Sequence, residues 1–269
     1  MSSLHDKIAL ITGGGSGIGR ATALLMAERG AAVMIAGTNR DAGAAVASEI
    51  HAMGGRAESI HMDLRVEADI KAAVEATVAR FGRIDILHNN AAYAPTHVLG
   101  EDVDILSIST ETWDAVMAGT LRGTMLGCRY GVIEMLKTGG GAIINTTSMY
   151  GVSAFNRMPA YSVSKGAIHI LTQHVATRFG RRGIRCNAIA PSMVRTPMLE
   201  AAVPEAFISI NEDASLTGRI ADPDDIARIV AFLASSDAAH LTGQIIHADG
   251  GTTAHLATYA DTRRFFGEE

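Results

Sequence analysis

The sequence predicts an α/β protein, built as one doubly wound parallel sheet of seven strands with helices on both faces. Two observations predict this fold. Short, nearly continuous apolar runs alternate with longer helical patterns along the whole chain of 269 residues, as is typical of parallel strands that are buried on both faces and joined by crossover helices. The first apolar run also ends in a glycine-rich turn, TGGGSGIG at 12–19. No linker or repeat divides the chain, so residues 1–269 are expected to form a single domain.

Seven apolar runs are predicted to be the strands, at 7–12, 32–37, 57–61, 84–89, 141–147, 184–190 and 243–248. Longer stretches between them have helical patterns, at 18–29, 41–53, 67–80, 111–136, 160–181 and 224–234. Two connections are long, 91–110 and 191–222, and both follow the carboxyl end of a strand, where open α/β sheets bind ligands. We therefore expect functional loops there, and a substrate loop at 191–222.

The predicted helix at 111–136 carries a glycine stripe. Gly119, Gly123, Gly127 and Gly131 recur every four residues, and each costs roughly 1 kcal/mol relative to alanine in a helix interior. A stripe of this kind lets another backbone approach closely. It predicts tight packing against the sheet or against a partner helix, with chance as the alternative.

The composition indicates a compact globular protein and excludes several classes. Hydrophobic residues make up 48% of the chain and the net charge is −5 without a basic block, so neither a nucleic acid nor a membrane is expected as a partner. Cys128 and Cys186 lie in apolar segments and are expected to be reduced core residues. The histidines, among them His169 and His174, form no ligand-like pair, so no metal site is expected. The first residues lack the pattern of a signal peptide, which makes the cytoplasm the expected location.

The glycine-rich turn predicts a dinucleotide site. Its glycines follow the spacing Gly13-x-x-x-Gly17-x-Gly19. Glycines permit a tight turn and let backbone amides approach a pyrophosphate, which then faces the free N–H groups of the following helix. An ordinary glycine-rich turn is the alternative, and the position after the first strand favours the dinucleotide.

A second short stretch, AYSVSK at 160–165, puts a phenol and an ammonium on one helical face, because Tyr161 and Lys165 are four residues apart. A nearby positive charge favours the ionised form of a phenol. The pair is therefore either a proton donor and acceptor held in working range or two ordinary surface residues.

Together these stretches resemble the short-chain dehydrogenase/reductase family. The resemblance covers nearly the whole chain and depends on the order and spacing of TGGGSGIG, NNAA at 89–92, Ser148, YSVSK at 161–165, NAIAPSMVRTP at 187–197 and DGG at 249–251. It implies a Rossmann-type domain and an NAD(P)-dependent oxidoreductase that interconverts a secondary alcohol and a ketone by hydride transfer. The alternative is a dinucleotide-binding protein of the same fold with little turnover, serving as a sensor or in an assembly.

The resemblance also implies roles for single residues. Tyr161 would be the general acid/base, Lys165 would make its phenol a usable proton carrier and bind the nicotinamide ribose, and Ser148 would orient the substrate oxygen. Thr120 stands where the family commonly has an asparagine that helps to hold a water in a proton relay, which puts that relay in doubt. Ala92 and Ser192 replace glycines that are usual in the family.

Cofactor contacts are expected along the carboxyl edge of the sheet, with Asp63 at the adenine and Val194 and Thr196 at the nicotinamide carboxamide. Asn90 and its neighbours Asn89 and Ala91 would line the adenosine side. The expected cofactor-binding residues are Gly13, Ser16, Gly17, Ile18, Gly19, Thr38, Arg40, Asp63, Leu64, Asn90, Tyr161, Lys165, Val194 and Thr196.

The end of the second predicted strand bears on the choice between NAD and NADP. NAD enzymes of this type usually have an aspartate there that binds the ribose hydroxyls, whereas this chain has Gly37, followed by Thr38, Asn39 and Arg40. No carboxylate would repel a 2′-phosphate, so the sequence favours NADP, with NAD as the alternative. Ser16 stands where some NADP enzymes have a basic residue, and the lack of a basic residue at this position counts against NADP.

The substrate is expected to be a hydrophobic small molecule, since methionines and aromatics gather in the segments around the predicted site. The residues expected to contact it are Tyr93, Met149, Phe155, Met193 and Met198. His97, Arg157 and Arg195 are candidates for a polar substituent. Family members are usually tetramers or dimers with helices near 111–136 and 160–181 at one interface, so a homo-oligomer is expected. The C-terminal YADTRRFFGEE either docks on a neighbour or frays.

Overall fold

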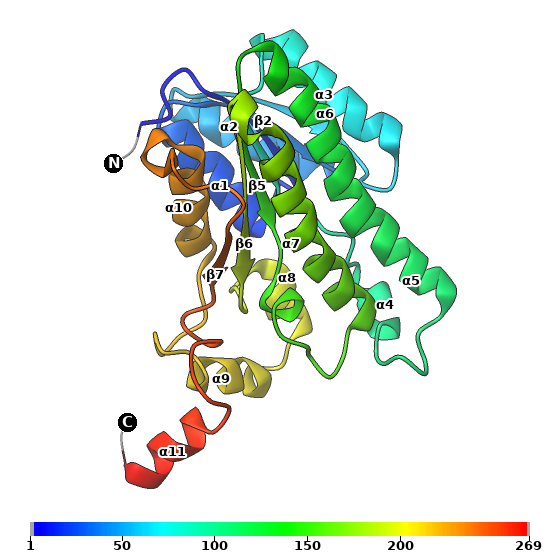
Figure 1. Cartoon of the computed structure of the whole chain (residues 1–269), viewed down its shortest axis with the longest axis vertical. Coiled ribbons are helices and arrows are strands. Elements are labelled where there is room, and N and C mark those ends of the chain that lie inside the picture. Colours follow the sequence, from blue (N-terminus) through cyan, green and yellow to red (C-terminus); the bar gives the residue numbers. More distant parts are fainter. Residues whose placement is uncertain (1–2, 268–269) are drawn as a thin grey trace.

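A single parallel sheet forms the centre of the protein. The computed structural model describes residues 3–267, and its seven strands pair in parallel in the order β3-β2-β1-β4-β5-β6-β7 (Figure 1). The strands are β1 (Ile8–Thr12), β2 (Ala32–Gly37), β3 (Arg56–His61), β4 (Ile86–Asn89), β5 (Gly141–Thr146), β6 (Ile184–Pro191) and β7 (Ile245–Ala248). The predicted fold class is confirmed.

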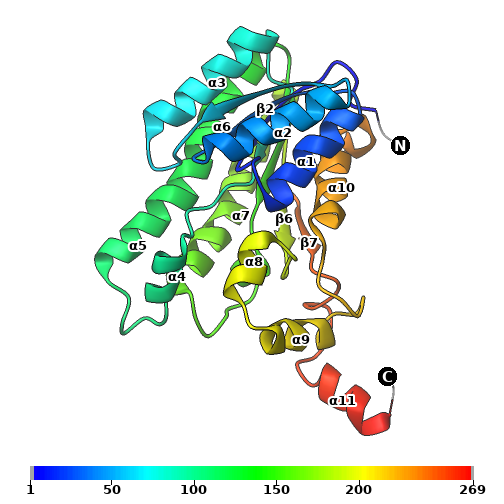
Figure 2. The same ribbon diagram turned by 180° about the vertical axis from the view of Figure 1, so that it is seen from behind.

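Six long helices cover the two faces of the sheet (Figures 1 and 2). Helices α1 (Gly17–Glu28), α2 (Arg40–Ala52) and α10 (Pro223–Ala234) enclose one apolar core, and α3 (Glu67–Phe81), α6 (Gly123–Lys137) and α7 (Pro159–Phe179) enclose the other. The strand side chains are buried on both faces; β1, for example, is buried at all five positions. This explains why the strands appear in the sequence as continuous apolar runs rather than as alternating ones.

The strand order reverses beside β1. The chain moves outward from β1 to β2 and β3, then returns to β4 on the other side of β1. Ligands of doubly wound sheets bind outside the carboxyl ends of the strands at such a switch point. The fold therefore places the β1–α1 turn and the segment after β4 at the expected binding crevice.

The predicted helix at 111–136 is divided in the structure. It consists of α5 (Thr110–Val116), a π-helical segment from Met117 to Arg122, and α6. π segments inside α-helices are rare and occur frequently at functional sites. The wide turn includes Thr120, whose hydroxyl accepts a hydrogen bond from the backbone N–H of Tyr93 at 3.1 Å.

The glycine stripe lies on the side of this helix that faces the sheet. A Cβ on Gly127 would collide with Oδ1 of Asn89 on β4, and a Cβ on Gly131 would lie 2.7 Å from the Leu87 side chain. Gly119 and Gly123 make the same close approach to residues after β4 and β3, Tyr93 and Leu64. Of the two expected kinds of packing, the structure shows the one against the sheet and the loops at its carboxyl edge.

Short helices occupy the connections that the sequence leaves without elements. Helix α4 (Thr96–Glu101) lies in the first long connection, and α8 (Pro197–Ala202) and α9 (Glu205–Asp213) lie in the second. The C-terminal segment forms α11 (Tyr259–Phe266), which stands away from the body of the protein and contacts α9 through Arg264 and Asp213 (Figures 1 and 2). Within residues 3–267, no helix is long and apolar enough to span a membrane.

Candidate active site

The β1–α1 turn has the geometry of a phosphate-binding loop. Gly13 and Gly17 have φ angles of 67° and 49°, a region that favours glycine. A Cβ on Gly19 would collide with the carbonyl oxygen of Gly13, so only glycine fits there. Ser16 precedes α1 without a side-chain capping hydrogen bond, and the first turn of α1 has no acidic residue. An anion at this helix N-terminus would meet free N–H groups and no opposing carboxylate.

Two other segments support this turn. The side chain of Asn90 donates to the carbonyl oxygens of Thr12 and Gly13 at 3.1 and 3.5 Å, which ties the segment after β4 to the turn. On the other side, the position that a Cβ on Gly17 would take lies 3.0 Å from Cγ2 of Thr196. The segments expected to bind the pyrophosphate and the carboxamide of a dinucleotide therefore lie side by side, and the residues present fit such a cofactor.

Ser148, Tyr161 and Lys165 meet at the carboxyl end of β5. Ser148 follows β5, and the interaction of its hydroxyl with the phenol of Tyr161 on α7 lowers the pKa of Tyr161. Lys165, one turn later on α7, is 2% exposed, and its Nζ lies 5.6 Å from the centroid of the Tyr161 ring. The ammonium donates to the carbonyl oxygen of Thr146 at 2.7 Å, which fixes it against the strand that leads to Ser148.

Burial changes the acidity of both groups. It raises the pKa of Tyr161 to about 12, against the lowering effect of the hydrogen bond with Ser148. Burial also lowers the pKa of Lys165 to about 8. From the sequence, Lys165 is expected to make the phenol more acidic, but in the structure the loss of hydration has the larger effect on the pKa of Tyr161. At pH 7 a neutral phenol therefore lies beside an ammonium.

His88 of β4 is a site neighbour that sequence reasoning missed. It is fully buried, and its Nε2 lies 2.9 Å from Oγ1 of Thr146, the residue whose carbonyl oxygen holds Lys165. Burial, with a smaller effect of the Lys165 charge, lowers the pKa of His88 to about 3, so its ring is neutral and does not repel the ammonium. The available signal was a polar residue inside the apolar run IDILHN.

Comparisons with known proteins identify the family. A family model described as enoyl-(acyl carrier protein) reductase matches residues 13–253. A probable short-chain type dehydrogenase/reductase of Bradyrhizobium diazoefficiens is 38% identical over 261 residues, which cover 97% of this chain and 92% of that protein. The chain belongs to the short-chain dehydrogenase/reductase family.

Two further relatives have named activities. The cyclohexanol dehydrogenase of an Acinetobacter species is 34% identical over 253 residues, covering 94% of this chain and 97% of that protein. The crystal structure of levodione reductase matches with a TM-score of 0.86 at 34% identity, covering 94% of this chain and 99% of that chain. As a member of this dehydrogenase/reductase family, the chain is an NAD(P)-dependent oxidoreductase that acts on CH–OH or C=O groups.

Thr120 occupies the position at which the family commonly has an asparagine. Its side chain is fully buried in the π-helical segment. Besides the contact of its hydroxyl with Tyr93, its carbonyl oxygen accepts a hydrogen bond from Oγ1 of Thr124 at 2.8 Å. The hydroxyl of Thr120 is therefore hydrogen-bonded to the segment after β4.

The expected adenine residue, Asp63, is paired within the chain. Its carboxylate accepts a hydrogen bond from Arg65 at 2.6 Å, and this contact lowers the pKa of Asp63. Arg65 also donates to the hydroxyl of Tyr93 at 3.2 Å and lies 4.6 Å above its ring. The hydroxyl of Tyr93, which was expected at the substrate, thus points to Arg65.

The other expected cofactor residues lie along the same edge. Thr38 and Arg40 are exposed after β2, and Asn39 between them caps α2 by accepting from the N–H of Ala42 at 3.0 Å. Val194 is buried and forms a bridge with Ala221, and Thr196 caps α8. The remaining two are Ile18, in the first turn of α1, and Leu64, after β3.

An aromatic cluster adjoins Ser148 on the expected substrate side. Tyr150, in the short 3₁₀ helix Met149–Gly151, stacks on Phe155 with 4.5 Å between ring centroids. Phe155 also lies 6.3 Å from Phe207 of α9. The structure thus brings Phe155 to the site together with two aromatics from separate segments. Met193 is half-buried, and Met198 is 61% exposed on α8.

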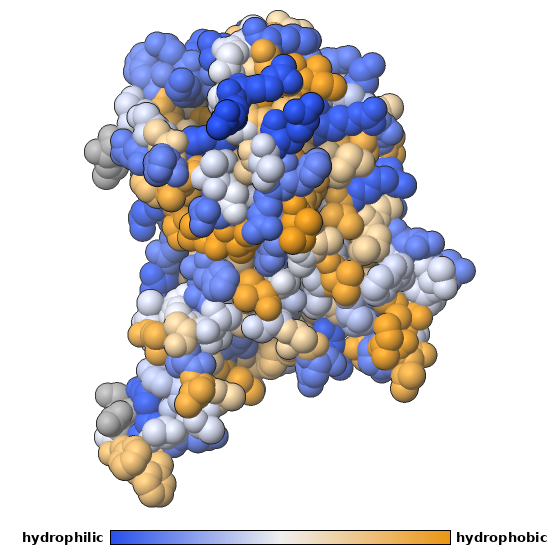
Figure 3. Space-filling view, in the orientation of Figure 1, coloured by the Kyte–Doolittle hydropathy of each residue, from blue (hydrophilic) through white to orange (hydrophobic). Residues whose placement is uncertain are grey.

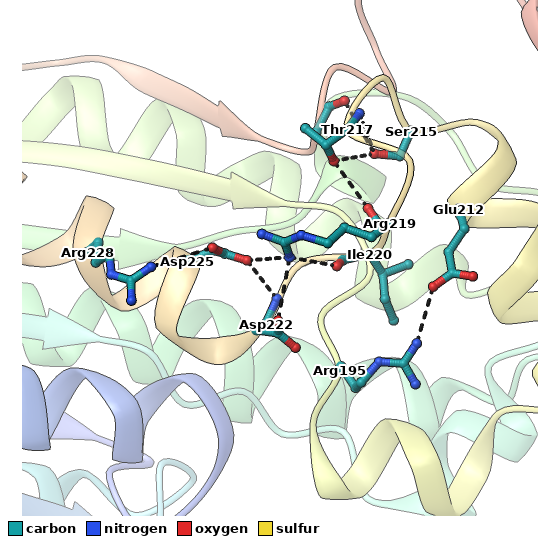
Figure 4. A network of polar contacts seen from close by, with 10 residues as sticks. Arg195, Glu212, Ser215, Thr217, Arg219, Ile220, Asp222, Asp225 and Arg228 are labelled. Atoms are coloured by element: carbon teal, nitrogen blue, oxygen red, sulfur yellow. Dashed lines mark hydrogen bonds and ion pairs between the residues drawn. The ribbon is translucent and has the colours of Figure 1, made fainter. Parts of the chain in front are cut away.

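Ion pairs hold the expected substrate loop at 191–222 (Figure 4). Arg195 donates to Glu212 of α9 at 3.2 Å, and Arg219 donates to Asp225 at the start of α10 at 2.6 Å (Figure 4). Arg195, a candidate for a polar substituent of the substrate, is therefore paired within the loop. Among the described residues, no group of three or more His, Cys, Asp or Glu side chains is arranged to hold a metal ion.

Proposed function

We propose that this enzyme interconverts a hydrophobic secondary alcohol and the corresponding ketone, with Tyr161 as the general acid/base. The observation that carries the proposal is the meeting of Ser148, Tyr161 and Lys165 at the carboxyl end of β5, where Nζ of Lys165 lies 5.6 Å from the centroid of the Tyr161 ring and is bonded to the carbonyl oxygen of Thr146. Hydride would be supplied or accepted by a nicotinamide dinucleotide when one is bound. The dinucleotide would be held by the β1–α1 turn, by Asn90 and by the segment from Val194 to Thr196.

The protonation states favour separate roles for Tyr161, Ser148 and Lys165 in ketone reduction. The neutral phenol of Tyr161 donates its proton to the carbonyl oxygen as this oxygen gains negative charge, and the Ser148 hydroxyl holds the same oxygen in place. The ammonium of Lys165 then stabilises the tyrosinate that remains. In alcohol oxidation the step runs in reverse: the phenol first gives up its proton to solvent, and the tyrosinate, stabilised by the Lys165 ammonium, accepts the hydroxyl proton.

The substrate class is proposed from the aromatic cluster. Flat rings of Tyr150, Phe155 and Phe207 suit a cyclic apolar substrate, because aromatic side chains supply large apolar contact area. The likeness to a cyclohexanol dehydrogenase supports the same class. We therefore propose a cyclic secondary alcohol or ketone, of which cyclohexanol and cyclohexanone are the simplest probes.

The test combines a substrate panel with one variant. The wild type is incubated with NAD⁺ or NADP⁺ and cyclic or acyclic secondary alcohols, and with the reduced cofactors and ketones, while nicotinamide absorbance is followed. Tyr161→Phe removes only the hydroxyl and is expected to lower kcat by at least about 10²-fold while cofactor binding, measured by fluorescence, is kept. A Tyr161→Phe variant with wild-type kcat, or no turnover of any substrate on the panel by the wild type, would reject the proposal.

We propose NADP as the preferred dinucleotide. Arg40 is exposed at the start of α2, directly after the strand end where a carboxylate is missing. A guanidinium binds phosphate bidentately. Arg40→Ala is therefore expected to raise the KM for NADP⁺ at least tenfold and to leave the KM for NAD⁺ within about twofold. Equal effects on both cofactors would contradict this preference.

We also propose that the protein is a homo-oligomer, a dimer or tetramer assembled through α6 and α7. Apolar side chains on these two helices face solvent, with exposed fractions of 45% for Ile133, 47% for Val163 and 68% for Ile170. An apolar groove beside them is lined by Met117, Leu121, Met125 and Leu171 among others. In Figure 3 apolar side chains are scattered across this view, and a separate apolar tip marks α11 at the lower left. Exposed apolar surface of this kind is typical of subunit contacts.

A further inference from the structure

Asp102 is a buried carboxylate at the N-terminus of the helix that carries Tyr161 and Lys165. It follows α4 in the connection 91–110 and is 0% exposed. We propose that Asp102 is a positioning residue, which holds the backbone of the catalytic tyrosine in place from a separate segment of the chain. This inference depends on the proposed role of Tyr161.

Asp102 accepts hydrogen bonds from the backbone at the start of α7. Its Oδ2 accepts a hydrogen bond from the N–H of Tyr161 at 2.9 Å, and its Oδ1 accepts one from the N–H of Ala160 at 3.0 Å. Its carbonyl oxygen accepts from the N–H of Met158 at 2.9 Å. Pro159, which stands between them, has no N–H. Every backbone donor from 158 to 161 is thus bound by this one residue.

Helix α7 lacks a cap of its own, which makes this contact necessary. The N-cap residue Met158 makes no side-chain capping hydrogen bond, and its φ and ψ of 62° and 52° are left-handed. A bulky residue is strained there, and such strain persists only where surrounding contacts impose it. The carboxylate of Asp102 supplies the missing acceptors and a negative charge, which is favourable at a helix N-terminus.

The same connection also supports the side chain of Tyr161. Val98 of α4, Val116 of α5 and Ala160 of α7 form a small apolar cluster, and Tyr161 and Trp113 pack against it. Both the backbone and the ring of Tyr161 therefore depend on the chain between residues 91 and 116. A misplacement of a reacting group by 1 Å costs about 10²-fold in rate, so removing the carboxylate should affect the chemical step more than cofactor binding.

The kinetic test compares Asp102→Ala and Asp102→Asn with Ser235→Ala. Ser235 is a matched control because it is 2% exposed, makes two hydrogen bonds to the backbone and lies after α10, at the amino ends of the strands. Asp102→Ala is expected to lower kcat at least tenfold with the KM for the cofactor within twofold. Asp102→Asn keeps one acceptor oxygen and should retain more of kcat. Ser235→Ala should keep wild-type kcat. Wild-type kcat in Asp102→Ala, or an equal loss in Ser235→Ala, would overturn the proposal.

A second readout does not depend on activity. Amide hydrogen exchange of Ala160 and Tyr161 is measured in the same full-length proteins under folding conditions. We expect exchange at these two amides to be at least tenfold faster in Asp102→Ala and unchanged in Ser235→Ala. Unchanged exchange in Asp102→Ala would overturn the positioning role. If the wild type turns over no substrate on the panel, the proposed function fails, and the exchange result still decides whether Asp102 holds the start of α7.

Discussion

At the scale of single residues, the site depends on a lysine that the fold buries almost completely. Lys165 is 2% exposed and has one carbonyl oxygen, that of Thr146, as its hydrogen-bond partner. Burying an ammonium costs free energy unless its partners compensate for the lost hydration. A structural role alone would be served better by an apolar side chain, so the charge at this position indicates chemistry.

This cost leads to a prediction for Lys165→Met. A fall in pKa from 10.5 to about 8 corresponds to about 3 kcal/mol of destabilisation of the folded state at pH 7. Above about pH 8 the folded lysine loses its proton while the unfolded one keeps it up to about 10.5, so the free energy of unfolding of the wild type rises with pH in this window. At lower pH both states are charged and the cost is fully present.

Urea unfolding of the two proteins at pH 7 and pH 9.5 checks this prediction. Since methionine also loses the bond to Thr146, worth about 1 kcal/mol, we expect Lys165→Met to be more stable by about 2 kcal/mol at pH 7. The difference should shrink by about 2 kcal/mol at pH 9.5, and turnover should be lost. A variant less stable than the wild type at pH 7 would contradict the account.

The sequence predicts the central residues of the candidate site better than the residues that hold them in place. The helical spacing of Tyr161 and Lys165 correctly predicts that they share a face, and the resemblance adds Ser148 at the same place. The contacts of Thr146, His88 and Asp102 could not be predicted in this way. They arise from the register of β4 beside β5 and from a loop that reaches α7 across more than 50 residues of sequence, and no local pattern encodes either. The pKa of Tyr161 was also misjudged, because the extent of burial is not visible in the spacing.

At the scale of elements, the helix from α5 to α6 shows how small residues bring the backbone against the sheet edge. Its glycines allow β4 and the loops after β3 and β4 to lie directly against the helix. The π-helical segment in its middle turns Thr120 toward Tyr93. The sequence predicts the close packing but not the π segment, because that segment is specified by tertiary contacts and not by the helical pattern.

This packing predicts the effect of single alanines. In Gly127→Ala the new Cβ collides with Asn89 Oδ1, so we expect a loss of about 1–3 kcal/mol in the free energy of unfolding. Gly180, at the end of α7, is the matched control. It has φ of −57° and no atom within 4 Å of a built Cβ, so Gly180→Ala should be neutral or stabilise by up to about 1 kcal/mol. Denaturant unfolding measures both, and equal stability of the two variants would contradict the packing account.

The short α-helices α4, α8, α9 and α11 are not predicted from the sequence. Each has six to nine residues, too few for a clear helical period. Their ends are held by contacts from elsewhere, as Arg264 of α11 is by Asp213 of α9. The seven strands and the six long helices were predicted because burial on both sides of one sheet imposes a strong apolar pattern.

At the scale of the whole molecule, the exposed apolar face of α6 and α7 predicts an association that depends on Ile170. Light scattering at micromolar concentration should give the mass of a dimer or tetramer for the wild type. Ile170→Lys places a charge where 68% of the side chain is exposed, so the folded subunit should be unharmed while the assembly dissociates into smaller species. A wild-type monomer, or a variant that assembles as the wild type does, would contradict this interface.

The proposed chemistry requires the phenol of Tyr161 to reach the reacting oxygen. The most direct measurement is a crystal structure of the enzyme with a nicotinamide dinucleotide and a cyclic ketone or alcohol bound. We predict that the Tyr161 hydroxyl lies about 2.6–3.2 Å from the substrate oxygen, with Ser148 bonded to the same oxygen and Lys165 still behind the phenol. A substrate oxygen bound beyond the reach of Tyr161, with the dinucleotide in place at the β1–α1 turn, would contradict the account.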